Sequence, residues 1–135
     1  MNIQKKFAAA FIAILLGSTA LYAADAPVAE QPIQMTSGGV GEKGMDDITA
    51  VQQHYSLKLV FAKTNGEYQA DVGVQISDHK GNTVVNTTAK GPVLLVNLAP
   101  GVYTVSASLE GETKTKRVVA HEDGLMTYFI RLNGK

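Results

Sequence analysis

Hydrophobic and polar residues alternate along most of the chain from Tyr55 onward, which is the pattern of half-buried β-strands. The alternation is clearest in residues 70–76 and 103–109, where Asp, Gly, Gln, Thr and Ser separate the apolar positions. Turn signals containing glycine divide the chain at intervals of about ten residues, a spacing typical of sandwiches and barrels. The pattern predicts seven short strands, at residues 55–61, 70–76, 83–88, 94–98, 103–109, 113–120 and 125–132. We therefore expect an all-β fold, an antiparallel sandwich of seven strands.

One short helix is predicted before the sandwich, over residues 45–54. Ile48, Val51 and Tyr55 fall at helical spacing, and the side chain of Asp46 is suited to cap the first turn.

The stretch that precedes this helix, residues 24–44, is predicted to be a flexible leader. It holds two of the four prolines, and residues 38–44 contain four glycines. Neither part shows a helical or a strand period, and Pro and Gly favour turns and extended segments.

Residues 1–23 have the three parts of a secretory signal peptide. Lys5 and Lys6 are basic, residues 7–16 are all apolar, and a cleavage signal ends at Ala23. As a helix this apolar run would cover about 15 Å, half of a ~30 Å hydrocarbon core. We expect the peptide to be removed, to leave no transmembrane segment, and to direct the protein to the periplasm or outside the cell.

Composition excludes several classes of protein. A length of 135 residues suits one domain. The 12 basic and 12 acidic residues cancel, whereas a nucleic-acid-binding protein needs a basic surface. The chain has no Cys, which excludes disulfides, thiolate metal sites and a Cys nucleophile. An exported domain without disulfides suits a bacterial envelope better than a eukaryotic secretory route.

Two stretches of the predicted sandwich carry a resemblance to a known family. They are GEYQADV at residues 66–72, continued by Val74, Ile76, Asp78 and Gly81, and LAPGVYTV at residues 98–105. With these stretches, residues 55–132 resemble a carboxypeptidase regulatory-like domain. The resemblance implies a transthyretin-like (prealbumin-like) Greek-key sandwich of seven strands. It also implies an accessory module that supports folding, docking or spacing and carries out no chemistry itself.

The glycine cluster is the first candidate site. Residues 39–44 match G-x-G-x-x-G, but a dinucleotide site needs a strand before this motif and a full βαβ unit around it. We interpret the cluster as a turn whose exposed amides could contact a partner. The predicted partner-binding residues are Gly38, Gly39, Gly41, Gly44 and Asp46.

The histidines are the second candidate. His54, His79 and His121 fall in three different loops or strand ends, without the H-x-x-x-H spacing of a helical metal site. The H-x-x-E element of a carboxypeptidase is absent. A prealbumin-like hydrolase would need site histidines, an arginine and a Tyr-Arg-Gly-Ser ending, whereas this chain ends RLNGK at residues 131–135.

A basic stretch, Lys114, Lys116 and Arg117, is the third candidate. Charge on a strand usually protects a sheet edge from pairing with another chain. The functional alternative is contact with an anionic glycan or lipid.

The sequence thus predicts a non-catalytic exported module of the bacterial envelope that binds an unknown envelope protein or glycan. It predicts no catalytic residue, no metal ligand, no cofactor and no nucleic-acid partner. The alternative is a periplasmic protein that binds a small ligand, a glycan or a metal. A prealbumin-like hydrolase is the third and least favoured function.

Overall fold

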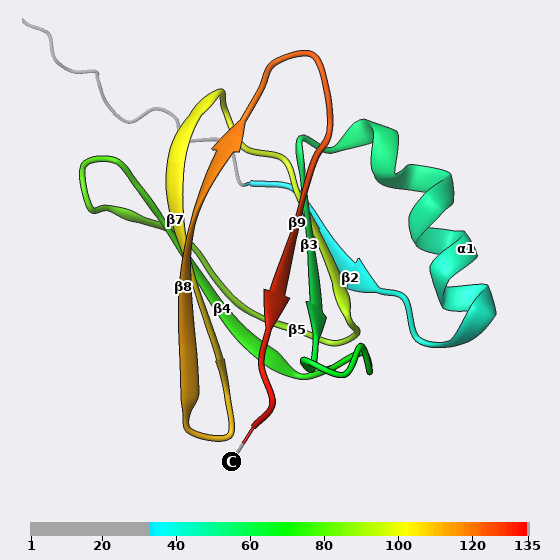
Figure 1. Ribbon diagram of the computed structural model, residues 1–135. Helices are drawn as coiled ribbons and strands as arrows, with labels where there is room; N and C mark the ends of the chain where they lie inside the picture. The colour runs from blue at the N-terminus through cyan, green and yellow to red at the C-terminus, as the bar shows by residue number, and fades with distance from the viewer. Residues whose placement is uncertain (1–32, 135) are drawn as a thin grey trace, which may run out of the picture. The chain divides into compact units, whose positions relative to one another are not determined.

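The computed structural model describes residues 33–134 (Figure 1). The predicted signal peptide and residues 24–32 of the predicted leader lie outside the described residues. The described part contains one α-helix, a short 3-10 helix and eight strands. In chain order these are β2 (Met35–Gly38), α1 (Gly41–Val51), η4 (Gln52–His54), β3 (Leu57–Ala62), β4 (Val72–Asp78), β5 (Thr83–Ala89), β6 (Val93–Val96), β7 (Gly101–Leu109), β8 (Glu112–Ala120) and β9 (Met126–Arg131).

The strands form two sheets of four, packed face to face, with the orders β2-β6-β3-β9 and β5-β4-β7-β8 (Figure 1). The second sheet is antiparallel throughout. In the first sheet β6 is antiparallel to both neighbours, but β3 and β9 run parallel. The prediction of a mostly β, sandwich-like fold is confirmed. The predicted count of seven strands was wrong, because β2 is an eighth, and the expectation of a wholly antiparallel arrangement was wrong at β3 and β9.

Alternation predicted the seven strands from β3 to β9 because each of them contributes to the same core. On β4, for example, Val72, Val74 and Ile76 are buried while Gln75 between them is exposed. Residues of both sheets form one apolar cluster, in which Phe61 is the largest fully buried side chain. At roughly 25 cal/mol per Å² of apolar surface removed from water, this shared core is the main stabilising term of the fold.

Strand β6 departs from alternation because it is buried on both faces. Leu94 and Val96 face the core between the sheets, whereas Val93 and Leu95 belong to a second apolar cluster on the outer face. Ile48 of α1 completes that second cluster, so the helix covers the outer face of this sheet. Among residues 33–134 no helix is long and apolar enough to cross a bilayer.

The helix begins earlier than predicted. It starts at Gly41 instead of Met45, and Val40 is its N-cap residue, without a side-chain capping bond. Asp46 therefore lies within the helix, and the predicted capping role of its side chain was wrong. The predicted leader also ends earlier, because residues 35–38 form β2 and residues 41–44 form the first turn of α1. The segment MTSG lacks alternation, so only its pairing with β6 reveals it as a strand.

Candidate functional site

A depression of about 740 Å³ opens at the end of the sandwich where β3, β7 and β9 begin. Three connections form it: residues 52–56 before β3, residues 97–100 before β7, and residues 121–125 before β9. The parallel pairing of β3 and β9, with Leu57 opposite Met126, brings the first and third of these connections to the same end. We call this feature the loop-end depression.

A buried serine anchors the base of the loop-end depression. The Oγ of Ser56 accepts a hydrogen bond from the Leu98 amide (2.9 Å) and lies 3.1 Å from the Leu98 carbonyl oxygen, to which it donates. The carbonyl oxygen of Ser56 accepts a bond from the amide of Met126 (3.0 Å). Ser56 therefore joins the connection before β3 to the connection before β7 and to the first residue of β9, which holds the base of the depression together.

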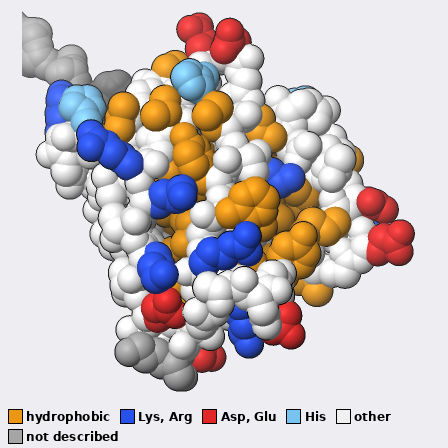
Figure 2. Space-filling view, viewed as in Figure 1, with side chains coloured by type: hydrophobic (Ala, Val, Ile, Leu, Met, Phe, Trp, Pro, Cys, Tyr) orange, Lys and Arg blue, Asp and Glu red, His pale blue; other side chains and the backbone are white. Residues whose placement is uncertain are grey.

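The rim of the loop-end depression is polar and exposed. His54, His121, Glu122 and Asp123 are exposed, and Gln52 is held by a 2.9 Å bond that Lys58 Nζ donates to its side-chain oxygen. Acidic and histidine side chains gather at this end of the sandwich in Figure 2. The rim therefore offers carboxylates, imidazoles and amides to a polar partner.

The structure brings together two of the three histidines. His54 and His121 line the loop-end depression, whereas His79 lies in the turn between β4 and β5 and is not among the lining residues. Sequence reasoning missed the shared location because His54 and His121 are far apart in the chain and no local motif connects them. Within residues 33–134, no three His, Asp or Glu side chains form a group that could hold a metal ion. A prealbumin-like hydrolase would also need an arginine at its site, and the residues that line the depression include none.

The glycines of the predicted partner-binding segment have a packing role in the structure. Gly39 is buried, and a Cβ on Gly44 would lie 3.1 Å from the carbonyl carbon of Gly39. A Cβ on Gly91 would lie 2.6 Å from the carbonyl carbon of Gly38. These glycines allow close backbone approach between β2, α1 and the segment before β6. Gly41 and Asp46 are exposed, and partner binding by this segment stays a prediction.

The LAPGVYTV stretch at residues 98–105 also has a structural role. Tyr103 is buried against the core, and its hydroxyl donates a 2.8 Å hydrogen bond to the carbonyl oxygen of Ala99. This bond closes the turn at Pro100 and Gly101. Burial raises the pKa of Tyr103, and the nearby charge of Asp78 adds to the effect.

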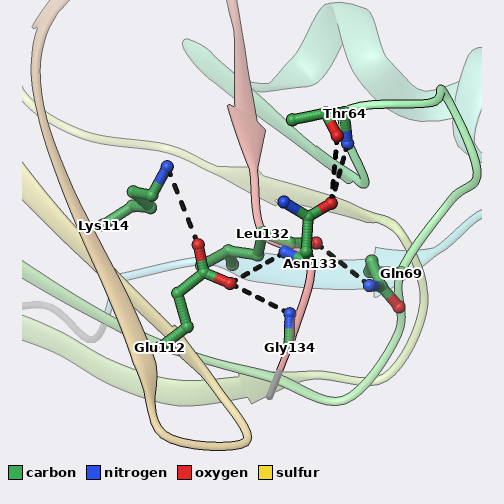
Figure 3. Close-up of polar contacts among 7 residues, drawn as sticks. All are labelled: Thr64, Gln69, Glu112, Lys114, Leu132, Asn133 and Gly134. Atoms are coloured by element: carbon green, nitrogen blue, oxygen red, sulfur yellow. Dashed lines mark hydrogen bonds and ion pairs between the residues drawn. The ribbon is translucent and has the colours of Figure 1, made fainter.

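A polar network fastens the opposite end of the sandwich (Figure 3). Glu112 Oε1 accepts bonds of 2.9 Å from the amides of Asn133 and Gly134. The side-chain oxygen of Asn133 accepts from the amide and hydroxyl of Thr64, at 3.1 and 3.2 Å. The Asn133 amide bond is the main reason that the pKa of Glu112 lies below its usual value, with Lys114 contributing less. The network holds the segment after β9 against β8 and the β3–β4 connection.

Compared with known proteins, the sequence matches no protein-family model and no curated protein.

Proposed function

We propose that this protein is a non-catalytic interaction module of the bacterial cell envelope. The loop-end depression is the observation that carries the proposal. It is wide and open, its base is fixed by Ser56, and its rim presents exposed charged and amide side chains. Such a surface is suited to a polar partner, whereas enclosed and largely apolar pockets are typical of small-molecule sites.

We further propose that residues 55–132 are a carboxypeptidase regulatory-like domain with a prealbumin-like Greek-key fold. The seven strands from β3 to β9 support this proposal, since they divide into the antiparallel set β5-β4-β7-β8 and the set β6-β3-β9. The turn at Pro100 and Gly101, closed by the Tyr103 hydroxyl, lies within the stretch 98–105 that carries the resemblance and also supports this proposal. On this proposal β2 and α1 are additions to the domain.

Export is part of the same proposal. Its support is the sequence of residues 1–23, with two lysines, an apolar run and a small residue at the cleavage position. Without Lys5 and Lys6, ten basic residues would remain against twelve acidic ones. An exported form with this charge is suited to partners that are not nucleic acids.

Binding of a small polar ligand or a transition metal is the second candidate function. The specific observation that favours it is the shared location of His54 and His121, since imidazoles are common ligands of zinc and copper. Calorimetric titration with zinc tests it. Heat that disappears in the variant His54→Ala/His121→Ala but persists in His79→Ala would support the metal version of this candidate, and absence of heat would refute that version.

Crosslinking in the native host tests the leading proposal. The full chain would carry a tag, and partners from the exported fraction would be compared between the unmodified protein and two variants. In Glu122→Gln/Asp123→Asn we expect loss of a reproducible envelope partner, because the rim loses both carboxylates. The control His79→Ala changes an exposed residue outside the loop-end depression, so the partner should be retained.

Two outcomes would overturn the proposal. One is a partner that both variants retain, which would place its binding surface elsewhere. The other is a folded protein found only in the cytoplasmic fraction. Deletion of residues 38–44 would be a poor test, because it removes the end of β2 and the first turn of α1.

A further inference from the structure

A second hollow, of about 230 Å³, lies between the edge strands of the two sheets. Strand β8 ends one sheet and β9 ends the other, and the hollow opens between the first half of β8 and the second half of β9. Its lining residues are Lys114, Thr115, Lys116, Phe129, Ile130 and Arg131. We call it the edge slot. Figure 2 shows Lys and Arg side chains next to hydrophobic ones over the region where Figure 1 places these strands.

The lysines of the edge slot project from an unusual face of β8. Lys116 lies opposite Val105 and Lys114 opposite Ala107, and both partners on β7 belong to the core. Directly opposite residues share a face of the sheet, so both lysines leave β8 on the side that faces the other sheet. Both are nevertheless exposed. Their side chains therefore reach solvent through the gap between β8 and β9.

Polar contacts close the edge slot at both ends. At one end the Val119 amide of β8 donates a 3.0 Å hydrogen bond to the hydroxyl of Tyr128 on β9. At the other, Glu112 accepts the bonds from Asn133 and Gly134. The slot is therefore a bounded recess that admits a compact group, and a long extended peptide could not run along β8 without breaking these contacts.

An aromatic ring and two cations without a close carboxylate distinguish the edge slot from a simple charged edge. Lys114 lies 3.7 Å from Glu112, whereas no ion pair within residues 33–134 involves Lys116 or Arg131. The Arg131 guanidinium lies 5.7 Å from the centre of the Phe129 ring, and Phe129 is 52 % exposed. A ring with exposed surface attracts the weakly positive C–H groups of another molecule because its face carries negative charge density.

We propose that the edge slot binds an acidic polysaccharide. A carboxylate of the glycan lies between Lys116 and Arg131, and a sugar ring packs on Phe129. Charge complementarity favours an anionic ligand, and the size of the slot favours one charged sugar unit at a time. This proposal concerns a different surface from the loop-end depression and does not rest on it.

Two other anionic partners suit the geometry less well. A lipid surface needs several apolar side chains that insert together beside the cations. Of the residues that line the slot, Phe129 is exposed but Ile130 is only 3 % exposed. An acidic peptide that bound by adding a strand to β8 would have to displace the contacts at both ends of the slot, and the poly-glutamate comparison below tests binding of a peptide through its charges alone.

Titration with oligogalacturonate, a carboxylated polysaccharide, tests the proposal on the purified protein. We expect binding that weakens as salt rises, because the charges of an open slot are screened. The variants Lys116→Glu and Arg131→Gln change residues on different strands. Each should raise the Kd for oligogalacturonate about tenfold or more. Phe129→Ala should also weaken it, which a purely electrostatic contact would not predict.

Lys90→Glu is the matched control, since Lys90 is exposed and does not line the slot. Lys90→Glu gives the same charge change as Lys116→Glu, but outside the slot. The affinity of this variant for oligogalacturonate should therefore stay within about twofold of the original value. Each variant is compared by circular dichroism and by its unfolding midpoint, and Arg131→Gln serves if Lys116→Glu fails to fold.

Several results would overturn the proposal. The first is a loss of affinity in Lys90→Glu as large as in Lys116→Glu. The second is binding of poly-glutamate or of phosphatidylglycerol vesicles that is as tight as binding of oligogalacturonate, or tighter. The third is absence of oligogalacturonate binding by the folded protein. If the lysines of β8 only protected the sheet edge from pairing with another chain, a different result would be expected. Lys116→Thr would then self-associate in sedimentation experiments, while its affinity for the polysaccharide stayed unchanged.

Discussion

Replacement of Gly91 by Ala tests the packing role assigned to the glycines. Gly91 is buried, and a Cβ there would meet the carbonyl carbon of Gly38 at 2.6 Å and its Cα at 2.9 Å. Both atoms belong to the backbone, so no side-chain rotation relieves the overlap. Gly38 is also held in register opposite Val93, and Ser37 next to it accepts a hydrogen bond from the Lys90 amide. Strand β2 must therefore shift to make room.

The expected cost follows from the effect of overpacking a core. Extra methyl groups in well-packed sites typically cost about 1–3 kcal/mol. Because the obstacle is a paired strand, we expect Gly91→Ala to lower the free energy of unfolding by about 2 kcal/mol or more. For a domain of this size such a loss lowers Tm by roughly 8–16 °C. Urea and thermal unfolding, followed by far-UV circular dichroism, measure both quantities.

Gly124→Ala is the matched control for this prediction. No atom lies within 4 Å of the position of its Cβ, and its backbone is not left-handed. Its stability should stay the same or rise by up to about 1 kcal/mol, because Ala restricts the unfolded chain. If Gly91→Ala proved as stable as Gly124→Ala, the backbone at Gly38 would have to be free to move, and the packing explanation would be refuted.

Three further predictions concern the core, the base of the loop-end depression and the polar network. Phe61→Ala should cost about 3–5 kcal/mol in urea unfolding, because Phe61 is fully buried; a loss below about 1 kcal/mol would contradict the core assignment. Ser56→Ala should cost about 1–3 kcal/mol, since the Leu98 amide loses its bond in a buried site, and an unchanged midpoint would argue against that contact. Stability should hold from neutral pH down to the usual carboxyl range and fall as pH drops through the lowered pKa of Glu112, because protonation removes the acceptor for two amides. The acid-induced fall should be smaller in Glu112→Gln than in the control Glu42→Gln, and equal falls would refute it.

The hydrophobic pattern was enough to locate the seven strands from β3 to β9, because each contributes side chains to the same core, whereas β2 lacks alternation and was missed. This pattern carries no information on strand direction, so the parallel pairing of β3 and β9 could not be predicted from it. The shared location of His54 and His121 depends on that pairing and was missed for the same reason. The sequence also suggested flexibility for residues 38–44, since glycine loosens an isolated chain. In the fold these glycines matter because they lack a side chain, which allows backbone segments to pack closely. Gly91, which is distant in sequence, approaches Gly38 in this way.

The position of β3 has a consequence for how the chain is made. Its segment Leu57–Ala62 is almost fully buried, and both strands that flank it, β6 and β9, come later in the sequence. At 5–20 residues per second, synthesis from Ala62 to Arg131 takes about 3–14 s, during which the β9 side of β3 has no partner. A short apolar strand with an open edge readily pairs with other chains. A product that ends before Met126 leaves this edge of β3 without its partner, so we expect it to aggregate more readily than the full chain.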